Sequence, residues 1–555
     1  MYGYQPVYYY QADTTDWMAV FDVGTYASDY FVNTNVDGQQ TTRITKVATG
    51  GIIHKIFLQA PTIEQVIKKY QTITGFQTVP PMWAFGWNQC KFGYYDSEMW
   101  WNAYQGYKTF NLPLDTMWGD IDYMDDYKVF TYSQQSYPDL PDKVKQIRAE
   151  GRQFVPIIDD AIAVRPNQGY KPYEDGLAKG VFVMRKDQSA PTTGGVWPGH
   201  AYYPDFFKPV TQQWWFDNLQ AFNAKVEFDG IWLDMNEASS TCTGYCYDSE
   251  RPRDSVKYEL PYWPGARDLE VQALGLDSLY TGVAGPNNTY RTELDVRSLY
   301  AIKESQATFN YLKQNNKRPF ILSRSNAPGL QKYAFHWLAD NWSREEWLSS
   351  SVDSLFEYNL FGIPMMGSDI CGFNLEPTAE LCTRWHQLGS FYPFSRNHKN
   401  SVWKQTEPYQ YNFTVPELDD GRTYTDLIRT SLLQRYSILR YIYSQFHEIG
   451  QFGGAFFKPL YYEYQADPMT FDDDANQVNI QLGHALKLSI QTRDLNQLST
   501  QYLFPADRWC QVMPSIDKSK CWDTTAQGGD STVQRLNSTI ADYQVHIRGG
   551  HIMPF

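Results

Sequence analysis

Apolar runs that end in polar or charged residues recur eight times between residues 83 and 398. Each run has the length of a strand and is bounded by turn residues or by amphipathic stretches. We therefore predict eight strands within Trp83–Gln89, Leu114–Met124, Phe154–Ile162, Gly230–Glu237, Arg318–Asn326, His336–Asn341, Ile363–Gly372 and Phe391–His398.

Helical periodicity fills most of the intervals between these runs. A segment rich in Pro, Gly and aromatic residues, 163–210, interrupts the alternation and predicts an insertion at an active-site rim. Eight strand–helix units predict an α/β fold, a (β/α)8 TIM barrel over residues 76–450. The predicted helices are Leu140–Glu150, Gln212–Ala224, Val296–Leu312, Arg344–Leu360 and a long one over Thr425–Gly450 with a glycine cap.

The pattern changes on both sides of the barrel. Residues 1–75 contain short Tyr, Val and Thr runs punctuated by Asn, Asp and Gly, which predicts part of an N-terminal β-sandwich. Residues 451–555 are again β-like and predict an incomplete C-terminal β-sandwich. The start lacks a signal peptide, and His546–Phe555 ends inside a predicted strand, so we expect a piece of a longer protein.

The composition of the chain limits the classes of molecule that it is expected to bind. The formal net charge is −14 and the pI about 5.2, which disfavours nucleic acid because phosphate binding needs a basic surface. No apolar run approaches the roughly 18–20 residues of a membrane-spanning helix, so no membrane span is predicted. Aromatic residues make up 16% of the chain, and such rings stack on sugars as well as filling cores.

Six of the seven cysteines fall into close pairs, which predicts disulfides and an oxidising compartment. Cys90 is left over. Neither a CxxC pair nor an HExxH motif occurs, so no zinc site is predicted. The predicted pairs are Cys242 with Cys246, Cys371 with Cys382, and Cys510 with Cys521.

Polar residues gather at the C-terminal ends of the predicted strands, where a parallel barrel builds its site. In the fourth strand, alternation places Trp232, Asp234 and Asn236 on one face and Met235 on the other. The other strands end in Asp120, Asp122, Asp159, Asp160, Arg324, Asp369 and His398, and in His336 and Asp340 on one shared face.

Any one of these residues could simply cap a helix or form a buried ion pair, but their convergence on one barrel mouth indicates a site. Several carboxylates with an Arg, a His and Trp side chains fit glycoside hydrolysis, in which one carboxylate attacks the anomeric carbon and a second acid protonates the leaving oxygen. The alternative is a metal-assisted barrel enzyme in which Asp120, Asp234 and Asp369 bind Mg²⁺.

Trp232-Leu233-Asp234-Met235-Asn236-Glu237 resembles the W-x-D-M-N-E signature of glycoside hydrolase family 31, the α-glucosidases. Asp122-Tyr123-Met124 resembles the branch of acid α-glucosidase, maltase-glucoamylase and sucrase-isomaltase. The resemblance implies a TIM barrel flanked by β-sandwiches, with no cofactor and no metal. It extends over most of the chain, in family order, through Pro80–Gly86, Trp197–Gly199, Ile321–Arg324, Gly367–Phe373, Phe391–His398 and His546–Pro554.

The resemblance also implies a role for each matching residue. Asp234 matches the catalytic nucleophile and Asp340 the general acid/base, and the spacing of Cys371 and Cys382 agrees with a family disulfide. Residues implied to bind the terminal glucose in the −1 pocket are Asp120, Arg324, Asp369 and His398, and those implied to line it are Asp159, Trp197, Trp232, Met235 and Phe373.

Three positions depart from the family pattern. Ala339 stands where the family usually has Gly before the acid/base, and we expect the extra methyl group to be tolerated. Ala238 replaces a frequent Pro. Asp160 replaces a common Pro and is expected to alter the polarity of the rim.

The implied activity is that of an exo-acting, retaining α-glucosidase that releases α-glucose from non-reducing ends of malto-oligosaccharides, starch or glycogen. A retaining site needs its two carboxyl groups about 5–5.5 Å apart. Asp340 must keep its proton at the working pH, which predicts an acidic optimum. Alternatives are another family activity (α-xylosidase, transglucosylase, α-glucan lyase or sucrase/isomaltase) or a non-catalytic carbohydrate-binding relative.

The predicted partners are α-glucoside oligosaccharides and polysaccharides, and the predicted location is lysosomal or secreted. Paired cysteines agree with that location. Asn341 adjoins a proposed catalytic residue and is expected to be unmodified. Asn-x-Ser/Thr sequons begin at Asn287, Asn341, Asn412 and Asn537.

Overall fold

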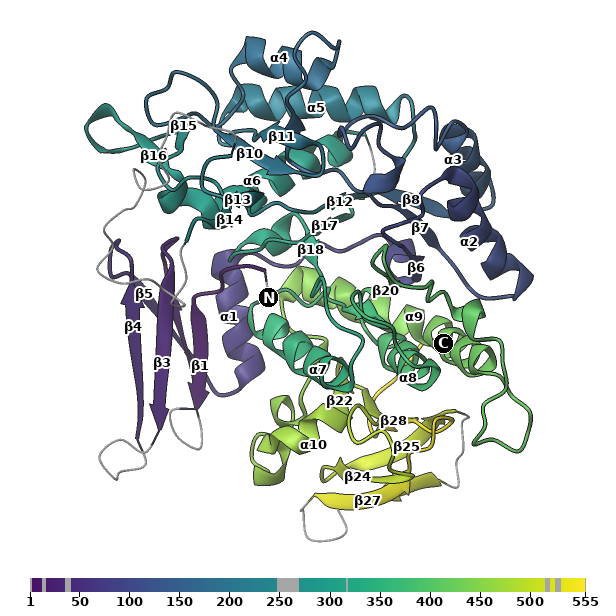
Figure 1. Ribbon diagram of the computed structural model, residues 1–555. Coiled ribbons are helices and arrows are strands. Elements are labelled where there is room, and N and C mark those ends of the chain that lie inside the picture. Colours follow the sequence, from purple (N-terminus) through teal and green to yellow (C-terminus); the bar gives the residue numbers. More distant parts are fainter. Residues whose placement is uncertain are drawn as a thin grey trace.

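Eight parallel strands form the central barrel of the computed structural model (Figure 1). They pair in the orders β19-β20-β6-β7-β8 and β12-β17-β18. A parallel bridge between Ile157 and Trp232 and a 2.9 Å hydrogen bond from Leu338 N to Gly367 O join the two sheets into a ring. The strands are β6 (Trp87–Gln89), β7 (Thr116–Gly119), β8 (Gln153–Pro156), β12 (Ile231–Leu233), β17 (Ile321–Ser323), β18 (Phe335–His336), β19 (Asp369–Ile370) and β20 (Ser395–Asn397).

Each predicted strand segment contains or overlaps one barrel strand, so the predicted TIM barrel is confirmed. The strands are shorter than the predicted segments because the chain turns at their C-terminal ends; η3 (Ile121–Tyr123), for example, begins directly after β7 and Asp120. The structure describes residues 2–11, 16–34, 41–246, 269–315, 318–514, 520–524 and 531–554.

Helices cover the outside of the barrel, and the predicted ones are confirmed to within a few residues. The long helix α9 (Tyr424–Phe452) is capped by Gly453 rather than by Gly450. It begins with a capping box in which Thr423 Oγ1 accepts from Asp426 N at 3.1 Å. Only the short η7 (Leu330–Lys332) lies between β17 and β18. The other helices of this part are η2 (Met82–Phe85), α2 (Ser97–Thr109), α3 (Leu140–Ala149), α5 (Pro209–Asn223), α6 (Glu293–Gln314), α7 (Glu345–Leu360), α8 (Ala379–Gly389), η8 (Pro408–Tyr411) and α9 (Tyr424–Phe452).

Two excursions leave the C-terminal ends of barrel strands. The predicted one, after β8, contains β9 (Ile162–Ala163), α4 (Lys171–Lys179), β10 (Thr193–Val196) and β11 (Gly199–Tyr202). A second excursion follows β12 and was not expected from the sequence. It contains β13 (Ser239–Thr243), β14 (Val271–Ala273), β15 (Leu279–Ala284), η6 (Pro286–Asn288) and β16 (Tyr290–Thr292).

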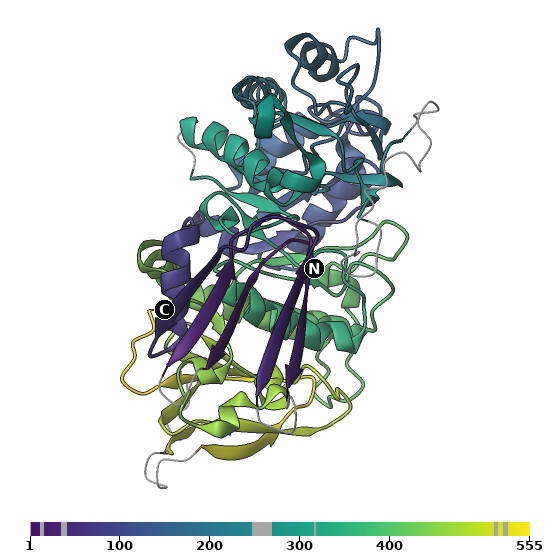
Figure 2. The ribbon, with the colours of Figure 1, turned by 90° about the vertical axis from the view of Figure 1, so that its left-hand side faces the viewer.

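The N-terminal region is β-rich as predicted, but it also contains α1 (Ile63–Thr74), where only sandwich strands were expected. Thr62 caps this helix, and Ile63, Val66, Ile67 and Tyr70 form its buried face. Figure 2 shows the N-terminal strands side by side along one flank of the barrel. They are β1 (Val7–Gln11), β2 (Trp17–Asp22) and β5 (Lys55–Ala60) in one sheet, and β3 (Ser28–Thr34) and β4 (Thr42–Ala48) in another.

The C-terminal region is also β-rich and lies at the lower end of the barrel in Figure 1. Its last strand ends at Arg548, so the expectation that the chain stops inside a strand is wrong for residues 549–554. Its helices are η9 (Leu460–Tyr462), η10 (Pro468–Phe471) and α10 (Asp473–Val478). Its sheets are β21 (Phe457–Lys458), β22 (Asn479–Leu482), β23 (Leu486–Ser489), β28 (Gln544–Arg548), β25 (Arg508–Met513) and β26 (Cys521–Asp523), and the pair β24 (Ser499–Phe504) with β27 (Thr532–Asn537).

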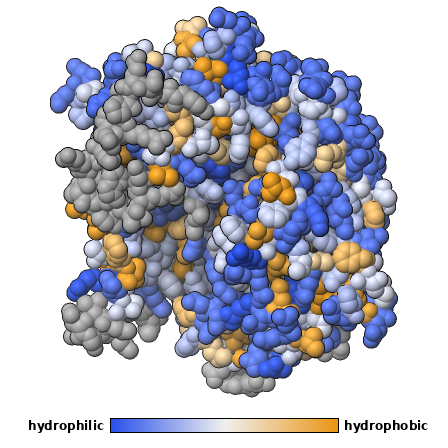
Figure 3. Space-filling view, in the orientation of Figure 1, coloured by the Kyte–Doolittle hydropathy of each residue, from blue (hydrophilic) through white to orange (hydrophobic). Residues whose placement is uncertain are grey.

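The three predicted disulfides, between Cys242 and Cys246, Cys371 and Cys382, and Cys510 and Cys521, are all present. No helix in the described part of the chain combines the length and apolar character needed to cross a membrane. The face of the molecule seen in Figure 3 is mostly hydrophilic, and its hydrophobic residues are scattered among polar ones.

A charge network joins the N-terminal and C-terminal regions. Lys458 Nζ, whose side chain is fully buried, lies 2.7 Å from Glu463 Oε1 and 3.2 Å from Glu64 Oε2 of α1. Arg548 and His484 also contact Glu463. Although burial opposes it, the hydrogen bond from His484 and the charge of Lys458 hold the pKa of Glu463 well below its ordinary value.

We expect Glu463→Gln to lower the free energy of unfolding at pH 7 by about 3 kcal/mol, because Lys458 loses a buried partner and keeps only Glu64. A depressed carboxyl pKa stabilises the fold above about pH 4.3 and less as pH falls toward the folded-state value. The difference between wild type and variant should therefore shrink at pH 3. Denaturant unfolding at both pH values measures it, with exposed Glu448→Gln as control; a pH-independent difference would contradict this account.

Candidate active site

A cavity of about 510 Å³ opens at the C-terminal ends of the barrel strands. Side chains from the barrel, from both rim excursions and from the N-terminal segment line it. Asp159 and Asp369, which were also predicted to face the sugar, are buried and do not line it. The predicted residues that do are Asp120, Trp197, Trp232, Asp234, Met235, Arg324, Asp340, Phe373 and His398.

The segment after β12 turns sharply, which alters the predicted orientations. The strand ends at Leu233, and Met235 has φ 56°, so its side chain reaches the cavity instead of the opposite face. Asn236 does not share the cavity with Asp234. It is fully buried and donates at 2.9 Å to both Glu304 Oε2 of α6 and Ser323 Oγ of β17. Strand alternation fails here because the chain is no longer extended.

Arg324, directly after β17, joins two carboxylates of the preceding strand end. Its Nε lies 3.3 Å from Asp234 Oδ1, and it donates to Glu237 through Nε at 3.1 Å and Nη2 at 2.6 Å. Burial raises the pKa of Asp234 to about 6; the charge of Arg324 opposes this shift, while Asp340 and Glu237 add to it. Arg324 thus favours the ionised form of Asp234.

Asp340 reaches the cavity from a left-handed turn after β18. Its φ is 33° and that of Ala339 is 45°, a region that costs a non-glycine residue roughly 1–2 kcal/mol. The Tyr2 hydroxyl donates to Asp340 Oδ2 at 3.3 Å. The expectation that His336 shares a face with Asp340 is wrong, because His336 is fully buried with Nδ1 2.9 Å from Ser323 O.

Asp120 and His398 meet on the opposite wall. His398 Nε2 lies 3.6 Å from Asp120 Oδ2, while Asp120 Oδ1 accepts from Ile121 N at 2.7 Å. Burial and the nearby Arg396 charge lower the pKa of His398 well below its ordinary value, so the imidazole is neutral. The rings of Phe373 and Trp232 lie 4.9 and 5.4 Å from the imidazole and fix its plane.

Asp369 lies behind this wall against a buried guanidinium. Its Oδ1 accepts from Arg396 Nη2 at 3.0 Å, and both side chains are fully buried. Three indole rings surround Arg396, at 4.7 Å for Trp118, 4.5 Å for Trp232 and 5.3 Å for Trp337. Asp369 therefore holds the cation that supports the floor of the cavity.

Asp159 and Asp160 form a buried acidic layer behind Asp234. Asp160 is fully buried beside Glu304, so the expectation that it changes the polarity of the rim is wrong. Burial, followed by repulsion from Asp234, raises the pKa of Asp159 well above its ordinary value. Burial also raises the pKa of Glu304 well above its ordinary value. The raised pKa values favour the protonated, neutral forms of these buried carboxyl groups.

The carboxylates of the Mg²⁺ alternative do not converge. Asp234 faces Arg324 and Asp369 faces Arg396. Among the described residues, no group with ligand atoms within 4.8 Å of one another contains Asp120, Asp234 and Asp369 together. Their geometry therefore gives no support to a magnesium centre.

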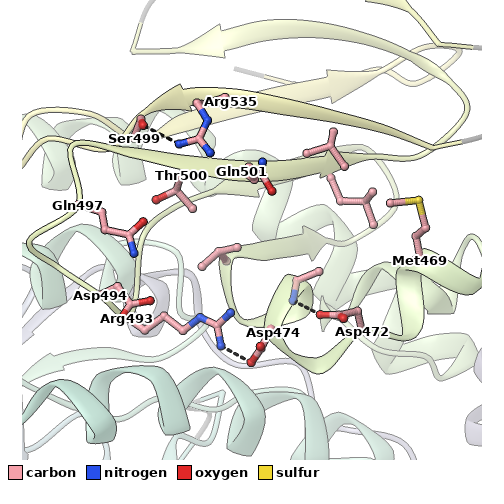
Figure 4. Close-up of a pocket in the computed structure, with 14 residues that line it drawn as sticks. Met469, Asp472, Asp474, Arg493, Asp494, Gln497, Ser499, Thr500, Gln501 and Arg535 are labelled. Carbon is pink, nitrogen blue, oxygen red and sulfur yellow. Dashed lines mark hydrogen bonds and ion pairs between the residues drawn. The ribbon is translucent and has the colours of Figure 1, made fainter.

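A second cavity, of about 420 Å³, lies in the C-terminal region between α10 and the β24–β27 pair (Figure 4). Several of its charged groups have partners: Arg493 pairs with Asp474, and Asp472 caps α10 through Ala475 N at 2.8 Å. No aromatic ring lines it. The cavity at the barrel strands is therefore the candidate active site.

Residues 77–445 match the model of the glycosyl hydrolases family 31 TIM-barrel domain. The chain belongs to glycoside hydrolase family 31. This family 31 chain is 32% identical over 572 aligned positions to lysosomal alpha-glucosidase of Rattus norvegicus. The alignment covers 100% of the chain and 56% of that protein. It is 32% identical over 491 positions to alpha-xylosidase 1 of Arabidopsis thaliana, covering 84% and 51%.

A crystal structure of glucosidase II alpha subunit shares the fold of the family 31 chain, with a TM-score of 0.83 at 24% identity. The match covers 100% of this chain and 55% of that one. The chain thus spans about half the length of these relatives. The predicted family and fold class are confirmed.

The family 31 site also contains residues that sequence reasoning missed. Tyr2 reaches it from the N-terminus, 338 residues before Asp340, and no local signal predicts that contact. The ring centroids of Phe92 and Trp197 lie 6.0 Å apart. Phe92 follows the end of a predicted strand by three residues, and this position was the available signal that it could face the site. Other unpredicted lining residues include Glu237, Gln272, Arg297, Trp337, Asn374 and Asn400.

Proposed function

We propose that the protein is an exo-acting, retaining α-glucosidase that releases α-glucose from non-reducing ends of malto-oligosaccharides, starch or glycogen. The observation that supports this most is one cavity lined by Asp234 and Asp340, with Arg324 3.3 Å from Asp234. An ionised carboxylate and a separate acid are what double displacement needs. The relationship to lysosomal alpha-glucosidase supports the choice of glucoside.

In the first step, Asp234 attacks the anomeric carbon from the β face while the bond to the leaving oxygen breaks. Asp340 gives that oxygen its proton. In the second step, Asp340 takes a proton from water, the water oxygen bonds to the anomeric carbon, and Asp234 departs as carboxylate. Two inversions return the α configuration.

The −1 pocket proposed for the terminal glucose comprises the remaining predicted residues. Asp120, His398 and Arg324 offer charged or polar groups for sugar hydroxyls, and charge-assisted hydrogen bonds of this kind are strong. Trp232, Phe373, Met235 and Trp197 supply apolar walls, which suit the faces of a sugar ring. Asp159 and Asp369 are proposed to bind glucose as well, although in this structure they lie behind the lining.

Arg324→Gln should shift the pH dependence of kcat/KM. The nucleophile must be ionised, so activity falls as pH drops through the pKa of Asp234, about 6 in the free enzyme. Without Arg324 this limb should move upward by roughly 1–3 pH units. Arg324→Lys keeps the charge and should move it less. An unmoved limb would show that Arg324 does not tune Asp234. A wild-type optimum below pH 5 would contradict a pKa of about 6 for Asp234 and agree with the acidic optimum expected from the sequence.

A product assay tests the proposed substrate. Maltose, isomaltose, starch and p-nitrophenyl α-xyloside are supplied separately, and glucose, xylose and anhydrofructose are measured. Glucose from maltose and starch, with the α anomer appearing first, supports the proposal. Faster xylose release would favour the α-xylosidase alternative, which the Arabidopsis thaliana relative supports. Anhydrofructose would indicate a lyase, longer glucosides a transglucosylase, and binding without product a carbohydrate-binding relative.

We propose a lysosomal or secreted location. Three disulfides persist in oxidising compartments and are rare in reducing ones. The lysosomal alpha-glucosidase relatives agree with this proposal.

A further inference from the structure

Three groups of side chains in the described part of the chain bring ligand atoms within 4.8 Å of one another. One contains Cys371 and Cys382, whose sulfurs are bonded to each other. Another centres on Glu463, which Lys458 already neutralises at 2.7 Å. The third is made of Cys90, Asp120 and His398, all buried, and has neither obstacle.

The barrel itself brings these three residues together. Cys90 directly follows β6, Asp120 follows β7 and His398 follows β20. These strands are neighbours in the order β20-β6-β7 and pair in parallel. Equivalent positions on adjacent strands lie about 4.8 Å apart. The register places His398 level with Cys90, whereas Asp120 lies two residues past the level of Cys90. The ends of the three strands nevertheless bring one donor each to a common region at the edge of the active-site cavity.

The donor separations are close to those of a tetrahedral metal site. Asp120 Oδ2 lies 4.0 Å from Cys90 Sγ and 3.6 Å from His398 Nε2. Zinc bonds of about 2.0–2.3 Å to O, N and S imply ligand separations of roughly 3.3–3.6 Å. The third separation, between the donors of Cys90 and His398, is within 4.8 Å, so shifts of roughly 0.5–1 Å would close the site around an ion. Asp120 Oδ1 accepts from Ile121 N, and this hydrogen bond turns Oδ2 toward Cys90 and His398.

The surroundings favour coordination over a purely structural cysteine. A buried free cysteine usually behaves as a small apolar side chain. Here its sulfur faces a carboxylate, and Phe373 and Trp232 hold the imidazole of His398 in place. A set of one S, one N and one O donor selects zinc-like cations over Mg²⁺ or Ca²⁺, which prefer oxygen.

We propose that Cys90, Asp120 and His398 form an inhibitory binding site for a thiophilic divalent cation such as Zn²⁺ or Cd²⁺. On binding, the sulfur bonds to the metal and the thiol proton leaves to solvent. Asp120 and His398 line the cavity, so the fourth coordination position faces it and takes water. The inhibitory effect rests on the proposed function, because the ion would engage two residues that are proposed to bind glucose. Binding of the metal does not depend on that proposal.

Cadmium titration of the metal-stripped protein tests the site directly. We expect one Cd²⁺ per chain in this site, with a thiolate-to-cadmium charge-transfer band in the ultraviolet. Cys90→Ser should abolish the band and weaken binding at least about 10–100-fold. His484→Gln, in the cluster around Glu463, is the matched control and should leave the band unchanged. Should Cys90→Ser not fold, Cys90→Ala replaces it with an apolar side chain.

The activity arm uses Zn²⁺ with the same proteins. Wild type should be inhibited competitively with the glucoside, while Cys90→Ser keeps its metal-free activity and loses at least about tenfold in Zn²⁺ sensitivity. Equal Cd²⁺ binding by wild type and Cys90→Ser, or a wild type without the charge-transfer band, would overturn the proposal. A charge-transfer band in a protein inactive on every glycoside would instead refute the proposed function and leave the metal site standing.

Discussion

Asp234→Asn is expected to lower kcat/KM for maltose by at least about 10⁴-fold, a loss typical of removing a catalytic nucleophile. The amide matches the carboxylate in shape but cannot form the glucosyl ester. Arg324 keeps both hydrogen bonds to Glu237 in the variant, so the fold should survive. Initial rates with maltose, together with a thermal unfolding curve, measure the two effects separately.

Asp122→Asn is the matched control for this substitution. Asp122 is another half-buried carboxylate, in η3 directly after β7 and Asp120, which accepts from Gly93 N at 2.6 Å and does not line the cavity. It should therefore retain most of the activity. Near-wild-type turnover by Asp234→Asn would falsify the assignment of the nucleophile.

Asp340→Gly is expected to lower kcat/KM for maltose by about 10²–10⁴-fold, the usual contribution of a general acid. Glycine accepts the φ of 33° found at this position, so the turn should keep its shape. An aryl glucoside such as p-nitrophenyl α-glucoside has a leaving group that needs little protonation, and its hydrolysis should suffer less in the first step. Comparing the two substrates measures the role of the acid.

Azide separates the two carboxylates by stereochemistry. It needs no base, so in Asp340→Gly it should attack the β-linked intermediate and yield α-glucosyl azide. In Asp234→Gly it should enter from the vacated β face and yield the β anomer. Equal losses for both substrates, or the opposite anomers, would reverse or refute the assigned roles.

The barrel could be predicted because its strands are buried between core and helices, which makes each a short apolar run with a polar end. The helix α1 was within reach too: Thr62 is an N-cap, and Ile63, Val66, Ile67 and Tyr70 have helical spacing. It was missed because the strand-like runs around it led to the prediction of a β-sandwich over the whole of residues 1–75. The excursion after β12 was missed because its short strands have little apolar pattern of their own.

Side-chain directions at the strand ends were the least predictable feature. Alternation holds only while the chain is extended, and Met235 and Ala339 adopt left-handed φ values directly beside the proposed catalytic residues. That turn sends Met235 into the cavity and buries Asn236 against Glu304. Asp160 likewise lies in the interior, because its environment is set by α6 and not by its neighbours in sequence.

The sequence by itself determined the eight-stranded barrel, the family, the disulfide pairs and nine of the 23 residues that line the cavity, since local patterns and motifs encode them. Only the tertiary structure decided which side chains meet. Tyr2 reaches Asp340, Arg396 stands inside three indoles, and Cys90 joins Asp120 and His398 across three strands. The physical reason is that parallel strands bring their C-terminal ends to the same edge of the barrel, however far apart the residues there lie in the chain.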